Sequence, residues 1–398
     1  MSRGRVLLLL PALLLLLGAT PTALAVGCPT QRVGYKEALA VLAANECEKL
    51  IVGGPQLSAA EAGALGALLG TNTALQELTI GNDRQDAADL FPQMGTAFLE
   101  DAGAAAIAPG LAENRGLRTV RVQCNWLGPA GGAALAAVLA SNAVLEVLHV
   151  TNNEVGDAGA AAFAAALRKA GGGSALRELH LRKNQIGDAG AAALGKLLGE
   201  QRKQPHDAGR GGGGGGGGSG AAPALRVLGL AGNNIGDAGA AAVAEGLASN
   251  GRLAVLGLLQ NEVGDAGAAA LSAALRRPGS ALSVLDVSRN VIGMAGVRAL
   301  GELIAHPGGT ALREIFATAN AFTRAGNEVL ADAVHRSATL TRLDVQRELY
   351  HRKDREAMTA HLSRNARLSG ATREQLLAQI TELEGKLKTC RANCHNEL

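Results

Sequence analysis

A short phrase recurs along most of this chain and is clearest as LRELHLRKNQIGDAG at residues 176–190. Each copy places two leucines, a third apolar residue, an asparagine and a further apolar residue at fixed spacing, often followed by GDAG. From residue 117 onward, successive copies begin 28, 31, 49, 28, 29, 30 and 28 residues apart. Periods of this size are typical of a solenoid of stacked units. The copies begin at Leu75, Leu117, Leu145, Leu176, Leu225, Leu253, Leu282, Leu312 and Leu340.

The two halves of each unit predict different secondary structures. The segment LxxLxL alternates inward apolar residues with other side chains, which predicts a short strand. The segment DAGAAALGKLLGE at residues 188–200 predicts a helix. Neither element buries its apolar face alone, whereas stacked units share a continuous core. We therefore expect an α/β solenoid, with a parallel sheet lining a concave inner surface and helices forming the outer ring.

Three polar or small positions of the repeat have structural explanations. An asparagine after each strand is expected to satisfy backbone groups of adjacent turns and to form a buried ladder. An aspartate at the start of the helix is expected to cap that helix, and a glycine two residues later lets neighbouring units approach closely. We therefore interpret the aspartate row as structural, not catalytic. The asparagines are Asn125, Asn153, Asn184, Asn233, Asn261, Asn290 and Asn320, and the aspartates are Asp157, Asp188, Asp237 and Asp265.

The repeated residues resemble the ribonuclease-inhibitor-like subfamily of leucine-rich repeats, and the resemblance covers roughly residues 47–365. It implies a horseshoe fold and protein binding, without implying a particular partner. The subfamily includes ribonuclease inhibitor, the Ran GTPase-activating protein and the sensor ends of innate immune receptors, which share architecture and little biochemistry. GTPase activation of the Ran regulator type is thus an alternative function, although that chemistry belongs to the cytosol.

The start of the chain has the features of a secretory signal peptide over residues 1–25. A basic segment, MSRGR, precedes the apolar segment VLLLLPALLLLLGA, and the small residues Ala23 and Ala25 stand before the expected cleavage. Pro11 interrupts the apolar run, which falls short of the ~20 residues of a membrane-spanning helix. We therefore expect the mature protein to enter the secretory pathway without a membrane anchor.

The last four residues, His395, Asn396, Glu397 and Leu398, are similar to the HDEL and KDEL retrieval signals of the endoplasmic reticulum. Asn396 stands where those signals have an aspartate. Together with the signal peptide, this tail predicts residence in the lumen of the endoplasmic reticulum. A secreted recognition protein is the alternative.

Residues 26–46 are expected to form an N-terminal cap, in which GYKEALAVLAAN is a helix. Because the predicted compartment is oxidising, Cys28 and Cys47 are candidates for a disulfide that fastens this cap. The repeats then occupy residues 47–346 and are interrupted by a flexible insertion at residues 200–224. That insertion contains eight consecutive glycines, but no GK[ST] follows them, so a phosphate-binding loop is not predicted.

The end of the chain departs from the repeat. Residues 347–370 are expected to cap the last unit, and residues 371–398 to form an amphipathic helix ending in the retrieval tail. Within that helix, residues 376–394 carry a heptad pattern of Leu376, Ile380, Leu383, Leu387, Cys390 and Cys394. The pattern permits either docking on the solenoid or a parallel homodimer.

Composition and motifs argue against catalysis and nucleic-acid binding. The formal net charge is +3 on 398 residues without a long basic run. No HExxH or GxSxG motif occurs, and no histidine stands near a cysteine with zinc spacing. We expect no enzyme activity, cofactor or metal, and we expect a protein partner.

Strand alternation predicts which residues face the concave surface. The early units are expected to present a polar area that includes Arg121, His149, His180 and Arg182. The middle and later units are expected to present an apolar area, which is either the main contact for a partner or a set of tolerated exposed residues. This area comprises Val227, Val255, Leu259, Val284 and, further along, Phe316.

Overall fold

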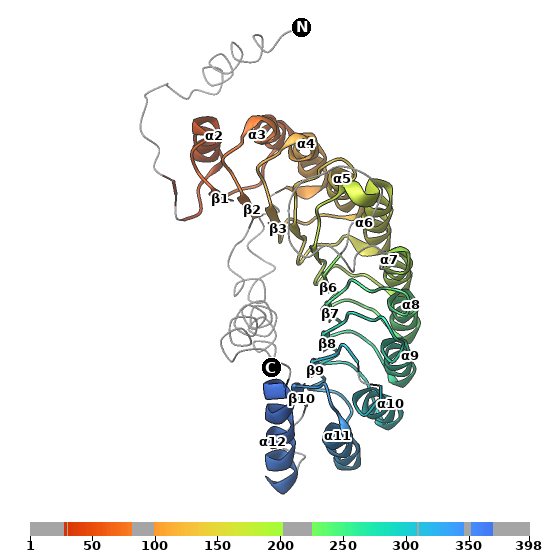
Figure 1. The fold of residues 1–398 in the computed structure, drawn as a ribbon. Coiled ribbons are helices and arrows are strands. Elements are labelled where there is room, and N and C mark those ends of the chain that lie inside the picture. The colour runs from red at the N-terminus through yellow and green to blue at the C-terminus, as the bar shows by residue number, and fades with distance from the viewer. Residues whose placement is uncertain are drawn as a thin grey trace.

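The computed structural model describes residues 28–29, 31–81, 99–201, 225–308, 310–345 and 352–368. These residues form an arc with strands on its inner side and helices on its outer side (Figure 1). The strands make one ten-stranded sheet in the order β1 to β10, and every neighbouring pair is parallel. The predicted α/β solenoid is therefore confirmed.

The strands are short and the helices between them are longer. The strands are β1 (Lys49–Val52), β2 (Glu77–Gly81), β3 (Thr119–Gln123), β4 (Val147–His149), β5 (Glu178–His180), β6 (Val227–Gly229), β7 (Val255–Gly257), β8 (Val284–Asp286), β9 (Glu314–Phe316) and β10 (Arg342–Asp344). The helices are α2 (Tyr35–Ala44), α3 (Ala59–Thr71), α4 (Glu100–Glu113), α5 (Pro129–Leu139), α6 (Gly156–Ala170), α7 (Asp188–Glu200), α8 (Asp237–Leu247), α9 (Asp265–Leu275), α10 (Met294–Ile304), α11 (Arg324–Arg336) and α12 (Arg352–Leu368). A short 3-10 helix, η1 (Gly171–Gly173), follows α6.

The core lies between the sheet and the helices. The central leucines of successive strands stand in register, as Leu179, Leu228 and Leu256 do, and all three are fully buried. Each helix turns its apolar side towards the same layer, and α7 contributes Leu194 and Leu198 to it. The buried residues form one continuous cluster along the array, as expected when each unit covers the next.

The first unit of the array precedes the copy of the repeat phrase that begins at Leu75. Strand β1 pairs with β2, and helix α3 follows it with Leu65 and Leu69 in the core. Ser58 and Glu61 form a capping box at the start of α3, which fixes the first turn of this helix. Cys47, Leu50 and Val52 are buried at the spacing of LxxLxL, so β1 belongs to the repeats predicted to begin at residue 47.

The predicted asparagine ladder is present. The side-chain oxygen of Asn233 accepts hydrogen bonds from the backbone N–H groups of Asn184 (2.9 Å) and Ile186 (3.0 Å) in the preceding unit. Its amide nitrogen donates to the carbonyl oxygens of Leu181 (3.0 Å) and Leu230 (2.9 Å). One buried side chain therefore satisfies backbone groups of two neighbouring units.

The expectation that each aspartate caps its own helix is wrong. Oδ1 of Asp188 accepts hydrogen bonds from the N–H groups of Gly236 (2.8 Å) and Gly239 (2.9 Å), which belong to the start of the next helix, α8. A Cβ atom at Gly239 would lie 2.5 Å from this oxygen, so the glycine is required for the approach. The carboxylate thus joins two units. Asp101, Asp157, Asp237 and Asp265 make the same pair of contacts to the units that follow them.

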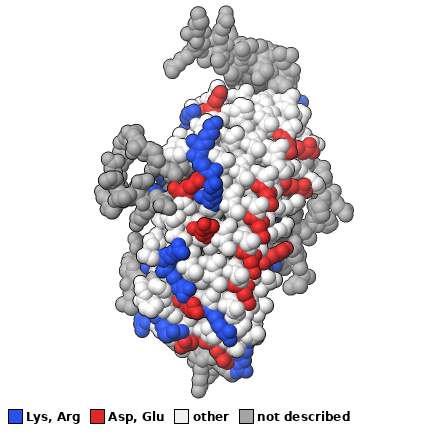
Figure 2. Space-filling view, turned by 90° about the vertical axis from the view of Figure 1, so that its right-hand side faces the viewer, with Lys and Arg blue, Asp and Glu red and all other residues white. Residues whose placement is uncertain are grey.

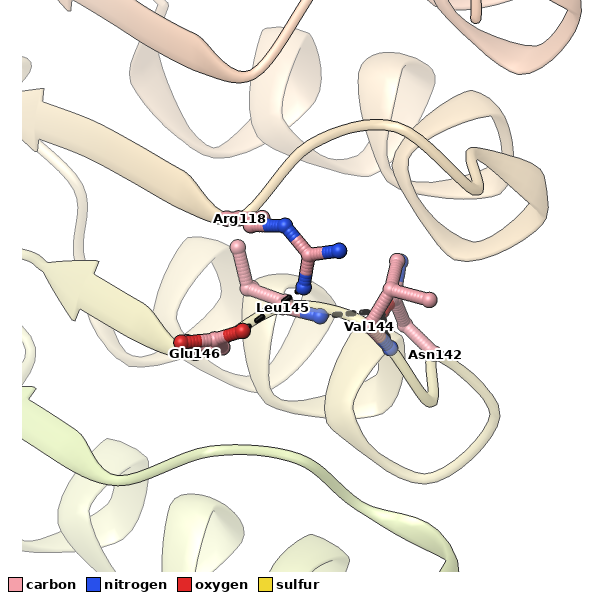
Figure 3. A network of polar contacts seen from close by, with 5 residues as sticks. All are labelled: Arg118, Asn142, Val144, Leu145 and Glu146. Atoms are coloured by element: carbon pink, nitrogen blue, oxygen red, sulfur yellow. Dashed lines mark hydrogen bonds and ion pairs between the residues drawn. The ribbon is translucent and has the colours of Figure 1, made fainter. Parts of the chain in front are cut away.

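A second set of buried asparagines, which the predicted ladder does not include, links the ends of the helices. The amide nitrogen of Asn142 donates to the Leu111 carbonyl oxygen (2.8 Å). Its side-chain oxygen accepts from the N–H groups of Val144 (2.9 Å) and Leu145 (2.8 Å), as Figure 3 shows. Beside it, Arg118 reaches Glu146 of the next unit at 2.7 Å. That ion pair is exposed, so its contribution to stability is at most about 1 kcal/mol.

Both ends of the array are covered by helices. At the N-terminus, α2 buries Leu39 and Leu42, and a disulfide joins Cys28 to Cys47 with their Cα atoms 5.3 Å apart. At the other end, α12 packs against α11, and Asn365 donates hydrogen bonds to the carbonyl oxygens of Ser337 and Leu340, both at 3.0 Å. Buried Asn365 therefore continues the second asparagine set into the C-terminal helix.

Several sequence predictions concern residues outside the described ranges. They are the signal peptide at residues 1–25, most of the glycine-rich insertion at 200–224, the heptad pattern at 376–394 and the retrieval tail at 395–398. Within the described ranges, no helix combines the length and apolar character required to cross a bilayer.

The contribution of the asparagine ladder to stability can be tested at Asn233, with the neighbouring residue Asn234 as the control. We expect Asn233→Ala to lower the free energy of unfolding by about 1–3 kcal/mol, because buried backbone groups lose their partners. Asn234 is exposed, so Asn234→Ala is expected to change it by less than about 0.5 kcal/mol. Urea unfolding followed by circular dichroism measures both. Equal effects of the two substitutions would contradict the role assigned to the ladder.

Because each aspartate caps the helix of the following unit, its removal is expected to destabilise that following helix. We expect Asp188→Ala to cost about 1 kcal/mol, the typical cost of losing a helix cap. Hydrogen exchange measured by mass spectrometry should become faster in peptides covering residues 236–247. Peptides covering residues 188–200 are the internal control and should change less. Faster exchange confined to that control segment would show that Asp188 caps its own helix after all.

Candidate functional site

The concave surface is built from the residues that flank the buried central position of each strand. The register places them in two rows that cross all ten strands. The first row is Lys49, Glu77, Thr119, Val147, Glu178, Val227, Val255, Val284, Glu314 and Arg342. The second row is Ile51, Thr79, Arg121, His149, His180, Gly229, Gly257, Asp286, Phe316 and Asp344.

The N-terminal part of this surface is charged. The Glu77 carboxylate forms ion pairs with Lys49 on one neighbouring strand (3.1 Å) and with Arg121 on the other (3.5 Å). The Arg121 and Glu77 side chains are about one third exposed, at 33% and 37%, so water screens the attraction between them. These pairs orient the side chains at the edge of the surface and add little to the stability of the fold.

Two histidines in the second row stack on each other. The ring centroids of His149 and His180 lie 4.1 Å apart, and the ring planes differ by 2°. Nε2 of His180 also lies 3.3 Å from Oε2 of Glu178. The His180 side chain is 17% exposed, so the stack presents a flat, partly accessible ring system at β5.

The middle of the surface is shallow and apolar. Gly229 and Gly257 occupy the second row on β6 and β7, and Val227 and Val255 stand beside them, half-buried, in the first row. The nearest atom to a Cβ built at Gly257 would be the Cα of Gly229, 3.9 Å away. Two adjacent strands therefore expose backbone where the flanking strands carry side chains.

Acidic and aromatic side chains occupy the C-terminal part. Asp286 is only 3% exposed, and its Oδ1 accepts a hydrogen bond from the N–H of Ser288 at 2.9 Å. The guanidinium carbon of Arg342 lies 4.7 Å from the centre of the Phe316 ring, a cation–π contact. Arg342 also approaches Glu314 at 3.8 Å. Asp286, Glu314 and Arg342 are not among the predicted binding residues, although strand alternation places them on this face.

The exposure predicted for the candidate binding residues is confirmed for only some of them. Five lie on the concave face and are partly exposed: Arg121, His149, His180, Val227 and Val255. The predicted exposure is wrong for the other four, because Arg182, Leu259, Val284 and Phe316 are buried. Phe316 lies under Arg342, and Leu259 packs with Ala231 in a small cluster separate from the main core. Alternation predicts the face of a residue, whereas burial depends on the side chains of neighbouring strands.

The outer surface separates charges into two columns (Figure 2). Aspartates stand in the first turns of α6 to α9, and α6 carries Arg168 and Lys169 in its last turn. This arrangement complements the helix dipoles. Some of the basic residues also pair with the next unit, as Arg276 does with Glu302 at 2.9 Å. The outer charges therefore have a structural explanation that the concave residues lack.

The side chains at the concave face can make several kinds of non-covalent contact. Across the part of the chain that the structure describes, no group of three or more His, Cys, Asp or Glu residues is arranged to hold a metal ion. The surface offers ring faces, aliphatic side chains, carboxylates and guanidinium groups, which are the usual contact groups of a protein interface.

Comparison with known families identifies the repeated unit. A family model described as Leucine Rich repeat matches residues 113–136, 141–164, 175–195, 223–244 and 281–301. The matched segments correspond to strand and helix units of the sheet, so these units are leucine-rich repeats, and they stack in an α/β solenoid. Membership of the ribonuclease-inhibitor-like subfamily stays a prediction. No curated protein sequence matches the chain.

Solved structures with similar repeats differ widely in sequence. The chain is 19% identical to Leiomodin-1 Actin-Binding Site 2, covering 35% of this chain and 79% of that one, with a TM-score of 0.30. It is 13% identical to an internalin from Listeria monocytogenes, covering 82% and 86%, with a TM-score of 0.35. For the TLR13–ssRNA13 complex the identity is 15%, the coverage 76% and 36%, and the TM-score 0.36. Values this low carry no argument about the partner.

Proposed function

We propose that this protein is a non-catalytic scaffold that binds a protein partner on its concave face. The observation that carries the proposal is the half-buried apolar area of Val227, Val255, Gly229 and Gly257 between two charged ends of one curved sheet. An apolar centre with a polar rim is the usual anatomy of a protein interface. The fold itself does not require this distribution, because the core uses the opposite side of each strand.

We further propose that the protein works in the secretory pathway and stays in the lumen of the endoplasmic reticulum. Residues 1–25 have the composition of a signal peptide, and residues 395–398 read HNEL. The disulfide between Cys28 and Cys47 supports this setting, because such bonds persist in oxidising compartments.

The location is tested by comparing the full chain with a version that lacks residues 395–398, both carrying the same internal epitope tag. We expect the full chain to stay in the cells and the shortened chain to reach the medium, because the tail is the proposed retrieval signal. Quantitative immunoblotting of cells and medium measures the ratio. Equal release of both would favour a secreted recognition protein, and retention of both in the cytosol would contradict entry into the pathway.

The binding surface is tested by substituting two valines in the same way. Val255→Trp places a bulky ring in the middle of the concave face, whereas Val291→Trp alters a residue that is 62% exposed in the loop after β8. We expect Val255→Trp to reduce the yield of cross-linked luminal partner at least about tenfold, which corresponds to a loss of 1.4 kcal/mol. Quantitative mass spectrometry after cross-linking in cells compares both variants with the unaltered protein. A normal yield with Val255→Trp, or an equal loss with Val291→Trp, would contradict a concave binding site.

A further inference from the structure

The residue just before each strand lies beside the concave face and links its unit to the preceding one. The backbone N–H of Arg226 donates to the carbonyl oxygen of Arg177 at 2.7 Å, and the N–H of Arg177 donates to that of Glu146 at 2.8 Å. The same bond recurs along the sheet, and none of these residues is buried. We call them the entry row: Glu48, Gln76, Arg118, Glu146, Arg177, Arg226, Ala254, Ser283, Arg313 and Thr341.

Positive charge accumulates at one point of the entry row. Arg118 is neutralised by Glu146 of the next unit, 2.7 Å away. Arg177 and Arg226 follow each other directly, with backbones about 4.8 Å apart, and both residues are exposed. Within the described ranges, neither of these two guanidinium groups forms an ion pair. Two like charges therefore stand on neighbouring strands and repel each other.

The carboxylates that stand nearest in the register serve other groups. Glu146 precedes Arg177 in the entry row but pairs with Arg118. Glu178 begins β5, and its Oε2 lies 3.3 Å from Nε2 of His180. The Glu178 side chain is 18% exposed, whereas Arg177 is open to solvent. The described residues therefore leave both guanidinium groups available to a carboxylate of another molecule.

The two arginines border the apolar area of the concave face. The backbone N–H of Val227 donates to the Arg177 carbonyl oxygen at 3.0 Å, and that of Val255 donates to the Arg226 carbonyl oxygen at 2.9 Å. Nη1 of Arg226 lies 3.3 Å from the carbonyl oxygen of Arg252, so this guanidinium leans towards the unit of β7. Each half-buried valine thus begins beside an exposed positive charge.

We propose that Arg177 and Arg226 bind acidic side chains of the protein partner, next to an apolar residue that contacts Val227 and Val255. A guanidinium presents a planar fork of N–H donors, which pairs with a carboxylate through two hydrogen bonds. Carboxylates would also remove the repulsion between the two arginines. The inference rests on the proposed function, because it names the chemistry of the segment that the concave face recognises.

The length of the positive stretch favours a short acidic segment over a continuous polyanion. Along the entry row, Glu146 stands before Arg177, and the uncharged residues Ala254 and Ser283 follow Arg226. A sulfated polysaccharide carries charge along its whole length, so it would meet a carboxylate on one side and no charge on the other. A peptide with two acidic residues beside an apolar one matches both the charges and the valines.

The test uses defined peptide libraries as the probe. Three displayed pools of nine-residue peptides have leucine at the centre and two adjacent positions fixed as Glu-Glu, Gln-Gln or Lys-Lys. We expect the purified protein to enrich the Glu-Glu pool about fivefold over the Gln-Gln pool, as two exposed ion pairs allow. The ratio should fall at high salt, because these charges are exposed to screening.

Substitutions of exposed arginines assign the effect to the entry row. We expect the double substitution Arg177→Gln and Arg226→Gln to bring the ratio close to one. The matched control is Arg115→Gln with Arg277→Gln, which removes two charges from exposed residues that follow α4 and α9. Reversing the charge with Arg177→Glu and Arg226→Glu should transfer the preference to the Lys-Lys pool. Urea unfolding checks that all variants fold.

Several results would overturn the proposal. They are equal enrichment of the Glu-Glu and Gln-Gln pools, a ratio unchanged by the Arg177→Gln and Arg226→Gln protein, and the same loss in the control protein. Capture of heparin that depends on these arginines, without enrichment of the Glu-Glu pool, would assign them to a sulfated polysaccharide instead.

Failure here is distinguishable from failure of the proposed function, because both variants enter the same cross-linking experiment in cells. If Val255→Trp removes the cellular partner while the Arg177→Gln and Arg226→Gln protein keeps it, the concave site stands and the acidic segment fails. If both variants keep the partner, both proposals fail. Loss of the partner in both variants is the result that we expect.

Discussion

Hydrogen bonds between neighbouring units hold this structure together. Most strands are only three residues long, so the sheet alone leaves many backbone groups in the connecting turns without partners. Buried asparagines fill that need at both ends of each unit: Asn233 joins the turns after β5 and β6, and Asn142 joins the ends of α4 and α5 to the start of β4. Asp188 adds a third link at the helix starts. Each link crosses from one unit to the next, so no unit is stable without its neighbour.

These links do not use the partly exposed residues of the concave face, such as His180 and Val255. The links use the turns and the helix ends, and the core uses the inward side of each strand. The second row can therefore change from Arg121 through His180 to Gly229 without any change in register. Function in such an array is expected at positions that the repeat does not fix, which is why the irregular concave rows carry more information about binding than the regular aspartates.

The sequence predicted the units whose spacing is regular and missed what depends on contacts between units. The phrase around Leu176 predicts β5 and α7 correctly, and β1 follows a weaker copy of the spacing at Cys47, Leu50 and Val52. The direction of capping by Asp188 was wrong because a carboxylate near one helix start reaches the next unit only once the units are stacked. Alternation placed Phe316 on the correct face, but its burial under Arg342 depends on a residue 26 positions further along the chain.

The glycines show how structure and function separate in this fold. At Gly239 a side chain would lie 2.5 Å from Asp188 Oδ1, so the close approach of units explains that glycine completely. At Gly257 the nearest atom to a Cβ would be 3.9 Å away, and the backbone lacks the positive φ that favours glycine. Neither packing nor conformation therefore requires a glycine there. The missing side chain leaves backbone exposed in the middle of the concave face, where the proposed partner would bind.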